Sequence, residues 1–280
     1  MIKNFKDRKQ YYNDKNRLHR EDGPAIEYKN KKDKRWFFNG KLHREDGPAI
    51  EWKNTKQWFL RGKRHRLNDL PAIENKDGTK QWWVNGKLHR KGNKPAIIEE
   101  NGHKEYYVNG KLHRDDGPAY ISGSETNYEK TWYKHGDLHR IGGPAIENVY
   151  HGGKSSDKEY WVNGIRHRKN GPAVIHKEGS VIFRKEYWIN GEIQKLEDKF
   201  FEGIKFFKDG RLHKEDGPAH IDKYSGTETW YFNGKKHRMD GPAIINKKTN
   251  KQYWYYAGKA MKVKTQEEFE RLMRLKAFIS

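Results

Sequence analysis

Aromatic pairs recur along the chain, and a glycine follows the second aromatic of each pair at a distance of three residues. The pairs are Trp36-Phe37, Trp58-Phe59, Trp82-Trp83, Tyr106-Tyr107, Trp132-Tyr133, Tyr160-Trp161, Tyr187-Trp188, Phe206-Phe207, Trp230-Tyr231 and Trp254-Tyr255. Side chains of a β-strand alternate between its two faces, so the two aromatics of a pair cover opposite faces. Asn often precedes the glycine, as in Asn39-Gly40, and Asn-Gly favours tight turns. The pattern predicts strands that each end in a tight turn.

Each turn leads into a basic segment ending in His-Arg or His-Lys, then an acidic or glycine-rich bend, then Pro-Ala. One copy is Leu42-His43-Arg44-Glu45-Asp46-Gly47-Pro48-Ala49. The apolar-polar run that follows, here Ala49-Ile50-Glu51-Trp52, is expected to be the partner strand. All nine prolines lie in this motif, at spacings of 24, 23, 24, 23, 26, 28, 46 and 24 residues. We therefore predict an all-β fold, an elongated array of about ten β-hairpin repeats of 23–24 residues.

The spacing of 46 residues marks a degenerate copy in residues 187–201, where Gln194 occupies the histidine position. We expect this copy to form a hinge between repeats one to seven, in residues 1–186, and the last repeats, in residues 202–262, or to shape a local pocket. Residues 263–280 differ again. Thr265-Gln266-Glu267-Glu268 is a capping-box sequence, with Phe269, Leu272, Met273 and Lys276 at helical spacing after it. These residues predict a short helix that caps the last hairpin.

Composition limits the classes of function. Only 33% of residues are hydrophobic and 35% are charged, but 14% are aromatic, and aromatic side chains bury enough area to hold a thin layered core. The net charge of +21 favours nucleic acid or another polyanion as partner, with an acidic protein as the alternative. The chain has no cysteine, no apolar leader and no apolar run long enough for a membrane span. We expect a cytoplasmic protein, in the host cytoplasm if it is viral.

Stacked repeats place equivalent residues in rows. The expected partner-binding row is Arg20, Arg44, Arg66, Arg90, Arg114, Arg140, Arg168, Lys214 and Arg238, with Lys41, Lys63, Lys87, Lys111 and Lys235 beside it after the turn glycines. Arginine forks suit phosphate oxygens, and lysines add point charge. The adjacent histidines form a row that is either structural or binding: His19, His43, His65, His89, His113, His139, His167, His213 and His237. Aspartates two or three residues after the basic pair are close enough to hold the bend in place, which favours a structural role for His.

We expect no enzyme, no metal and no cofactor. Zinc needs several ligands converging on one point, whereas the histidines are a whole repeat apart. The chain has no Ser-His-Asp arrangement in a supporting motif and no glycine-rich phosphate loop opening a helix. Carboxylates of the degenerate copy, Glu192, Glu197 and Asp198, are the one place where an active site is conceivable.

The period, the aromatic-x-Asn-Gly-Lys segment and the following histidine resemble the MORN repeat family, best in residues 83–89, Trp-Val-Asn-Gly-Lys-Leu-His. Arg replaces the family's usual glycine after His, and Gly-Pro-Ala is outside the common pattern. Tracts similar to Leu-His-Arg-x-Asp-Gly-Pro-Ala occur in uncharacterised proteins of large DNA phages and giant viruses. The resemblance implies β-hairpins in an elongated antiparallel sheet that binds or scaffolds. We expect a non-enzymatic scaffold for nucleic acid. The alternatives are an antitoxin-like or viral anti-defence inhibitor of an acidic protein and a sponge for a small phosphorylated nucleotide.

Overall fold

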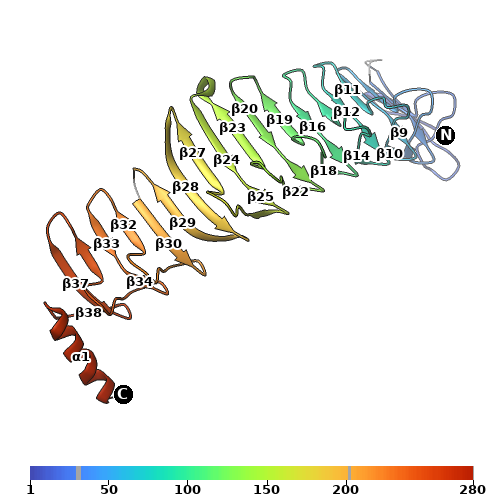
Figure 1. The fold of residues 1–280 in the computed structure, drawn as a ribbon. Coiled ribbons are helices and arrows are strands. Elements are labelled where there is room, and N and C mark those ends of the chain that lie inside the picture. The colour runs from blue at the N-terminus through green and yellow to red at the C-terminus, as the bar shows by residue number, and fades with distance from the viewer. Residues whose placement is uncertain (30–32, 201–202, 280) are drawn as a thin grey trace. The chain divides into compact units, whose positions relative to one another are not determined.

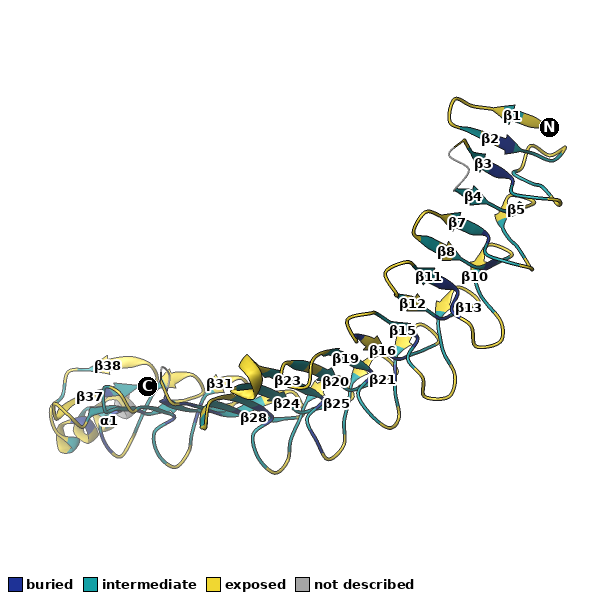
Figure 2. Ribbon diagram, turned by 90° about the horizontal axis from the view of Figure 1, so that it is seen from above, coloured by how far each residue is buried: buried dark blue, intermediate teal, exposed yellow. Residues whose placement is uncertain are grey.

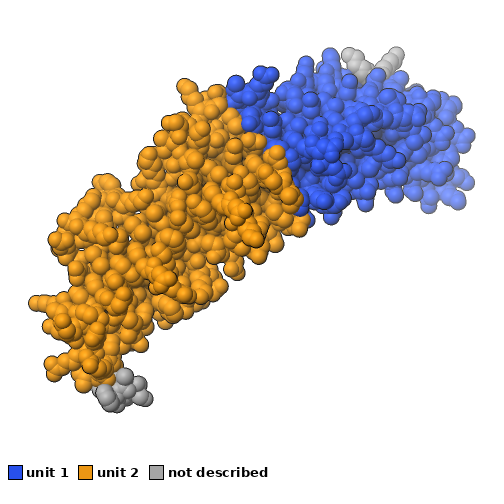
Figure 3. Space-filling model, viewed as in Figure 1, with its two compact units in different colours: residues 1–139 blue, residues 140–280 orange. Residues whose placement is uncertain are grey.

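A computed structural model describes residues 1–29, 33–200 and 203–279. It confirms the all-β hairpin repeats and the single C-terminal helix. The chain divides into two compact units, Met1–His139 and Arg140–Ser280 (Figure 3). Within each unit, strands lie side by side in chain order and pair in antiparallel fashion (Figure 1).

In the first unit, each strand of the main sheet pairs with the strands before and after it in the following order. The strands are β1 (Ile2–Asn4), β2 (Arg8–Tyr11), β3 (Ile26–Tyr28), β4 (Lys34–Arg35), β7 (Ile50–Trp52), β8 (Thr55–Gln57), β11 (Ile73–Asn75), β12 (Lys80–Gln81), β15 (Ile97–Ile98), β16 (Lys104–Glu105), β19 (Tyr120–Gly123) and β20 (Tyr128–Thr131).

Each aromatic strand continues past the main sheet into a small hairpin closed by the predicted tight turn. In the first unit these hairpins are β5 (Phe37–Phe38) with β6 (Lys41–Leu42), β9 (Phe59–Leu60) with β10 (Lys63–Arg64), β13 (Trp83–Val84) with β14 (Lys87–Leu88), β17 (Tyr107–Val108) with β18 (Lys111–Leu112), and β21 (Tyr133–Lys134) with β22 (Asp137–Leu138). Asn39, Asn85 and Asn109 have positive φ at these turns. The sequence-based prediction of the turns is therefore confirmed.

The second unit repeats this plan with longer strands at its start. Its main sheet contains, in pairing order, β23 (Ile146–Tyr150), β24 (Ser155–Glu159), β27 (Val174–Glu178), β28 (Val181–Ile189), β29 (Glu192–Asp198), β30 (Gly203–Lys208), β32 (His220–Asp222), β33 (Thr227–Thr229), β36 (Ile244–Asn246) and β37 (Lys251–Tyr256). A 3-10 turn (His151–Gly153) joins β23 to β24.

Small hairpins close the repeats of the second unit as well. They are β25 (Trp161–Val162) with β26 (Ile165–Arg166), β34 (Tyr231–Phe232) with β35 (Lys235–Lys236), β31 (Arg211–Leu212) with the end of β30, and β38 (Lys259–Met261) with the end of β37. The degenerate copy forms the hairpin of β28 and β29, which pairs with β27 on one side and β30 on the other. Residues 201 and 202, where this copy ends, lie outside the described residues. Its role as a hinge stays a prediction.

The core is thin and is built from the motif itself. Every alanine of Pro-Ala is fully buried: Ala25, Ala49, Ala72, Ala96, Ala119, Ala145, Ala173, Ala219 and Ala243. Buried aromatics such as Phe59, Trp82, Tyr106 and Trp254 supply most of the remaining apolar volume. In Figure 2 the strands carry most of the buried residues, and loops project in series along one side of each unit.

The C-terminal helix α1 (Gln266–Ile279) begins where the capping box predicts. The Glu268 backbone N–H donates to Thr265 Oγ1 at 3.2 Å, and the Glu268 carboxylate accepts from the Lys264 backbone N–H at 2.7 Å. Phe269 is fully buried, which docks the helix on the last repeats. Gln266 Nε2 also donates to the Met239 carbonyl at 2.9 Å and ties the helix to a motif loop.

Candidate functional site

The motif arginine folds back over the first aromatic of its own repeat. We call the segment from this arginine, or Lys214, to the proline the motif loop, and the sheet face that it covers the loop face. The Arg66 guanidinium carbon lies 3.6 Å from the centre of the Trp58 ring, and that of Arg90 lies 3.7 Å from the Trp82 ring. The same stacking occurs for Arg20, Arg44, Arg114, Arg168 and Arg238, and Lys214 places its ammonium over Phe206. Cation–π attraction therefore fixes each loop on the sheet.

Hydrogen bonds occupy the edges of these stacked guanidinium groups. Arg44 Nη1 donates to the Pro48 carbonyl at 3.4 Å and to Glu51 Oε1 at 3.1 Å, while Nε donates to Asp46 Oδ1 at 2.9 Å. Contacts to the proline carbonyl recur for Arg20, Arg66, Arg90, Arg114, Arg140, Arg168 and Arg238. The arginine row is thus held by contacts within the chain.

The glycine before the proline gives the guanidinium its space. A Cβ on Gly47 would lie 2.8 Å from Arg44 Cζ, and a Cβ on Gly143 would lie 2.7 Å from Arg140 Cζ. At these two positions a side chain would displace the stacked guanidinium, whereas the two longer loops have Leu70 and Lys94 before the proline. In the shorter loops Gly-Pro-Ala therefore follows from packing: space for Arg, a rigid bend, and a residue small enough for the buried position after it.

Eight of the motif histidines connect their repeat to the next one. His43 Nδ1 accepts from the Arg61 backbone N–H at 3.3 Å, and His65 Nδ1 accepts from the Asn85 N–H at 3.1 Å. Equivalent bonds involve His19, His89, His113, His167, His213 and His237. His139 closes the first unit, and its own N–H donates to the Trp132 carbonyl. We call the bond from a turn N–H to a motif Nδ1 the histidine clasp.

The clasp requires a neutral imidazole with its proton on Nε2, because a protonated ring has no acceptor nitrogen. Burial lowers the pKa of His113, and electrostatic interactions with His135 and Lys134 lower it further, against the opposing effect of Asp115. Burial also lowers the pKa of His237. Both shifts favour the form that accepts the hydrogen bond.

The residues after the turn glycines lie differently from the arginines. In the first unit the turn cations are Arg17, Lys41, Lys63, Lys87 and Lys111. The stem of each one lies over the turn glycine of the following repeat, and the Lys63 stem is 3.7 Å from the Cβ position of Gly86. Over the described residues, none of the five side chains takes part in an ion pair or hydrogen bond. The stems are ordered by packing, while the charged ends stay available to a partner.

A second basic row lies on the loop face, six residues before the turn glycines in most copies. The strand lysines of the first unit are Lys9, Lys34, Lys56, Lys80, Lys104 and Lys130. Glutamates alternate with the first four of these lysines across the sheet: Glu27 lies between Lys9 and Lys34, Glu51 between Lys34 and Lys56, and Glu74 between Lys56 and Lys80. The three carboxylates bind Arg20, Arg44 and Arg66. Further along, Ile98 and Ile121 replace the glutamates. Sequence reasoning missed this row. It could have been found, because each of these lysines lies two residues before the first of two adjacent aromatics, as Lys34 does before Trp36, Lys130 before Trp132 and Lys9 before Tyr11.

Two motif loops carry one extra residue, and this residue changes the partner of the next arginine. In the third loop, residues 66–71, Asp69 accepts from Arg90 Nε at 2.9 Å and Lys94 Nζ at 2.9 Å. In the fourth loop, residues 90–95, Asn93 accepts from Arg114 Nε at 2.9 Å. In the shorter loops Arg20, Arg44 and Arg238 bind their own Asp instead. The insertions thus connect loops three, four and five laterally.

Grooves separate successive motif loops of the first unit. The groove between loops one and two, residues 20–24 and 44–48, has a volume of about 1100 Å³. Its lining combines the acidic residues Glu21, Asp22, Glu45 and Asp46 with the basic residues Arg17, Arg20, Lys41, Arg44 and Arg61. The groove between loops three and four has about 450 Å³ and is lined by Leu67, Leu70, Trp82 and Val84 together with basic residues. The next groove has about 310 Å³. Loop sequence therefore sets a different chemistry in each groove.

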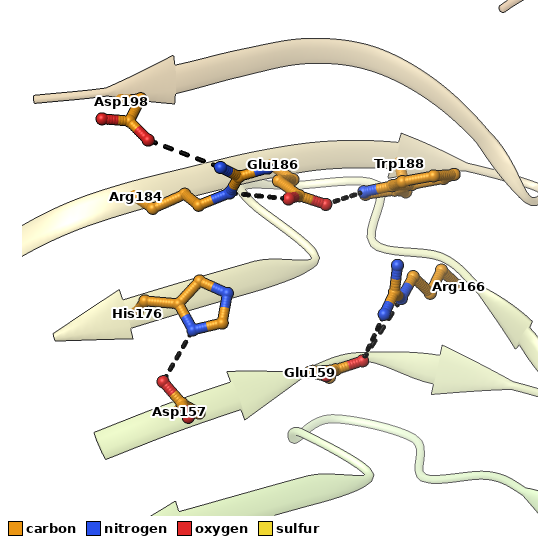
Figure 4. A network of polar contacts seen from close by, with 8 residues as sticks. All are labelled: Asp157, Glu159, Arg166, His176, Arg184, Glu186, Trp188 and Asp198. Atoms are coloured by element: carbon orange, nitrogen blue, oxygen red, sulfur yellow. Dashed lines mark hydrogen bonds and ion pairs between the residues drawn. The ribbon is translucent and has the colours of Figure 1, made fainter. Parts of the chain in front are cut away.

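The degenerate copy and its neighbours carry a polar network on the long strands of the second unit (Figure 4). Arg184 binds Glu186 at 2.9 Å and the buried Asp198 at 3.4 Å, and Trp188 Nε1 donates to Glu186 at 2.9 Å. The Arg166 guanidinium lies between the Trp161 and Trp188 rings and binds Glu159. Glu197 pairs with Lys185 and Lys195. These carboxylates are engaged by cations of the same sheet.

No protein-family model matches the chain, and no curated protein matches it. No three His, Asp or Glu side chains in the described ranges converge as a set of metal ligands. Among the described helical residues, none forms a segment long and apolar enough to cross a membrane.

Proposed function

We propose that the first unit is a non-enzymatic track for a polyanion, that this polyanion is nucleic acid, and that the turn cations bind its phosphates. One observation carries the proposal: Arg17, Lys41, Lys63, Lys87 and Lys111 form an ordered row without internal ion pairs. Equivalent residues recur every second strand, so the charges are about 10 Å apart along the sheet. A regular row of identical charges suits a repeating polymer better than the irregular surface of a folded protein.

The strand lysines strengthen the field on the same face. Lys41 lies across its hairpin from Phe38, and the alternation of the strand places Phe38, Trp36 and Lys34 on one face. The two basic rows therefore flank the motif loops on the loop face. We also propose that the chain is a variant of the MORN type of hairpin repeat, on the support of its regular hairpins and the Asn-Gly-Lys-Leu-His segment.

The test changes Lys41, Lys63, Lys87 and Lys111 together to Gln, which removes charge but leaves stem atoms over the glycines. A matched control changes Lys177, Lys223, Lys251 and Lys262 of the second unit to Gln, four exposed lysines with the same total charge. Anisotropy titrations of labelled DNA and RNA over a series of salt concentrations give affinity and salt slope. We expect the slope to fall by about 3 and affinity near 0.15 M salt to fall by roughly 100-fold, since each phosphate contact contributes about 0.7 to the slope on a single strand.

The control should lose far less affinity than the row variant. Equal losses of affinity in the two variants would show that only the net charge of the protein matters, and would overturn the track. No binding by the unmodified chain near 0.15 M salt would overturn the function itself.

A protein partner is the second candidate, and the loop tips of the second unit favour it. Ile141 is 75% exposed and Met239 is 50% exposed, each at the tip of a motif loop. Exposed apolar anchors at loop tips are typical of protein interfaces. An inhibitor of an acidic protein would use these tips together with nearby basic residues, and capture of that partner would be lost in an Ile141→Ser, Met239→Ser variant.

A further inference from the structure

The third and fourth motif loops interrupt a series of acidic loop tips in the first unit. Loops one, two and five carry Glu21-Asp22, Glu45-Asp46 and Asp115-Asp116 at their tips. The third loop carries Leu67-Asn68-Asp69-Leu70 and the fourth carries Lys91-Gly92-Asn93-Lys94. Asp69, the one carboxylate in the tips of loops three and four, is paired with Arg90 and Lys94. An anionic ligand near the loop face is repelled by the acidic tips of the other loops, so the groove between loops three and four is where it approaches the sheet most easily.

One wall of this groove is apolar, and its floor is the Arg90 guanidinium stacked on Trp82. Leu67 is 65% exposed, Leu70 is 45% exposed, and Val84 is also exposed, whereas the Trp82 ring beneath is buried. The volume of about 450 Å³ lies within the range of small-ligand sites and fits one flat heterocycle with its sugar. Exposed leucines on a polar, charged chain indicate a ligand with an apolar surface of its own.

Cations without internal partners lie beside the exposed apolar side chains of the groove. Lys87 is directly opposite Val84 in the β13–β14 hairpin, and Lys91 follows in the wall of the groove. Neither side chain forms an ion pair or hydrogen bond within the described chain. An apolar pocket with free cations at its rim matches a nucleotide, whose base is flat and apolar on its faces and whose phosphate is anionic.

Contacts made by the extra residue of loop three hold the two walls of the groove in place. Asp69 binds Arg90 and Lys94 across the groove, and Trp82 Nε1 donates to the Asp69 carbonyl at 3.0 Å. Arg90 is stacked on Trp82 and its side chain is only 14% exposed. These bonds fix the wall before any ligand arrives, which lowers the entropic cost of binding.

We propose that this groove takes one unpaired base of a single-stranded nucleic acid whose phosphates lie along the turn cations. The inference rests on the proposed function and deepens it. A base enters the groove only when it is free of its complement, because a paired base is stacked and hydrogen-bonded within the duplex. Single strands should therefore bind more tightly than duplexes of the same sequence, and binding should depend on Leu67 and Leu70.

The experiment compares the full chain with Leu67→Ser, Leu70→Ser and with a matched control, Ile141→Ser, Met239→Ser, which also removes two exposed apolar residues from loop tips. The probes are a labelled single strand of about 20 nucleotides, its duplex, and inorganic polyphosphate, which has charge but no bases. Folding of each variant is checked by its urea midpoint. A 2-aminopurine in the strand reports on base insertion by its fluorescence.

We expect the single strand to bind at least about 10-fold more tightly than the duplex. Leu67→Ser, Leu70→Ser should weaken the single strand by about 5- to 10-fold with an unchanged salt slope, abolish the 2-aminopurine response, and leave polyphosphate binding as it was. The control should match the unmodified chain in every measurement.

Equal affinity for duplex and single strand, or an unchanged affinity in the leucine variant, would overturn the base site. If polyphosphate still bound in that case, the proposed track along the turn cations would stand. Absence of binding to all three probes would overturn the proposed function together with the site. Displacement of the strand by an acidic tryptophan-containing peptide, but not by AMP, would overturn the base site in favour of a protein ligand.

Discussion

The two units share one architecture but differ in where their charges lie. Arg90 of the first unit and Arg238 of the second stack on a Trp, bind a proline carbonyl and pair with an Asp. The turn position, by contrast, is basic in five copies of the first unit, as Arg17 after Asn16 and as Lys after the glycine in the next four, and then Asp137. In the second unit it reads Ile165, Glu192, Arg211, Lys235 and Lys259.

The position of the strand lysines shows the same contrast. It is Lys in every copy of the first unit, but in the second unit Lys158 and Lys185 are followed by Ile204, Glu228 and Gln252. The hairpins form with either kind of residue, so the fold does not require the lysines. Residues present in both units explain the fold, and positions that vary between the units without disturbing it are where function is to be sought.

The largest expected effect tests the shared architecture. Replacement of Arg90 or Arg238 by Ala removes a cation–π contact and charged hydrogen bonds, and we expect a loss of about 2–3 kcal/mol in the free energy of unfolding for each variant. The Lys87 charge faces solvent and has no partner in the described chain, so Lys87→Gln should lower the free energy of unfolding by less than about 0.5 kcal/mol. Urea unfolding of the full chain measures all three. A large loss for Lys87→Gln, or a small one for either arginine, would contradict the division of roles.

The second prediction makes the second unit resemble the first. Ile165→Lys and Glu192→Lys together place cations in two turns that lack them, and both residues are exposed. We expect the salt slope for a single strand to steepen by about 1.4 and affinity near 0.15 M salt to rise by roughly 10-fold.

A matched control for this gain places the same two charges elsewhere, at the exposed Ile182→Lys and Glu178→Lys of the β27–β28 hairpin. Equal gains from the two variants would show that position in the turn row is irrelevant. The comparison between units would then concern net charge only.

The repeat period, the hairpins, the turns and the helix were all predictable, because glycine, proline and aromatic residues mark them locally. The contacts of Arg44 were not, because they involve Trp36 and Glu51, which adjoin Arg44 only after the loop has folded back. The sequence-based partner list joined Arg44 to Lys41, since the two are close in the chain. Their environments differ because Arg44 covers an aromatic ring, whereas the Lys41 stem crosses a glycine and leaves its charge free.

The effect of the loop insertions was also beyond the sequence. A bend tolerates one extra residue, so the sequence offers no reason to expect a new contact there. In the structure, however, Asp69 adopts positive φ and binds Arg90 of the next loop, 21 residues away in the chain. Only the stacking of repeats places that arginine within reach. Specific lateral contacts between repeats depend on register, which the repeat period alone does not give.

The third prediction addresses this contact between loops. Arg90 and Lys94 hold the pKa of Asp69 at about 2, below its ordinary value of 3.8. The carboxylate is 42% exposed, so solvent screening reduces its contribution to about 1 kcal/mol. This contribution is complete above about pH 4 and is lost as the pH falls through 2. Asp69→Ala should remove it at neutral pH, measured by urea unfolding.

Asp46→Ala in the second loop is the matched control for Asp69, because Asp46 binds only the arginine of its own loop and is more exposed. We expect a smaller loss of stability than for Asp69→Ala and no change in base insertion. A larger loss for Asp46→Ala would remove the distinction between loops with and without the extra residue.

The smallest expected effect concerns one histidine clasp and its dependence on pH. His113 Nδ1 accepts from the His135 N–H at 3.2 Å, and burial lowers the His113 pKa, so the unfolded chain takes up the proton first as the pH falls. The stability of this clasp is therefore complete above about pH 6.5 and declines below it.

Replacement of His113 by Asn tests whether the stability of the clasp falls as the pH falls. The amide oxygen still accepts from the turn N–H but does not titrate, so the loss of stability between pH 7.5 and pH 5.5 should be smaller in the variant, by at most about the 1 kcal/mol of one hydrogen bond. His237→Asn gives the same comparison in the second unit, where Nδ1 accepts from the Ala257 N–H. Because both clasps join a motif to the next turn, equal reductions are expected. A reduction in only one unit would show that the clasps, unlike the arginine stacks, are not shared architecture.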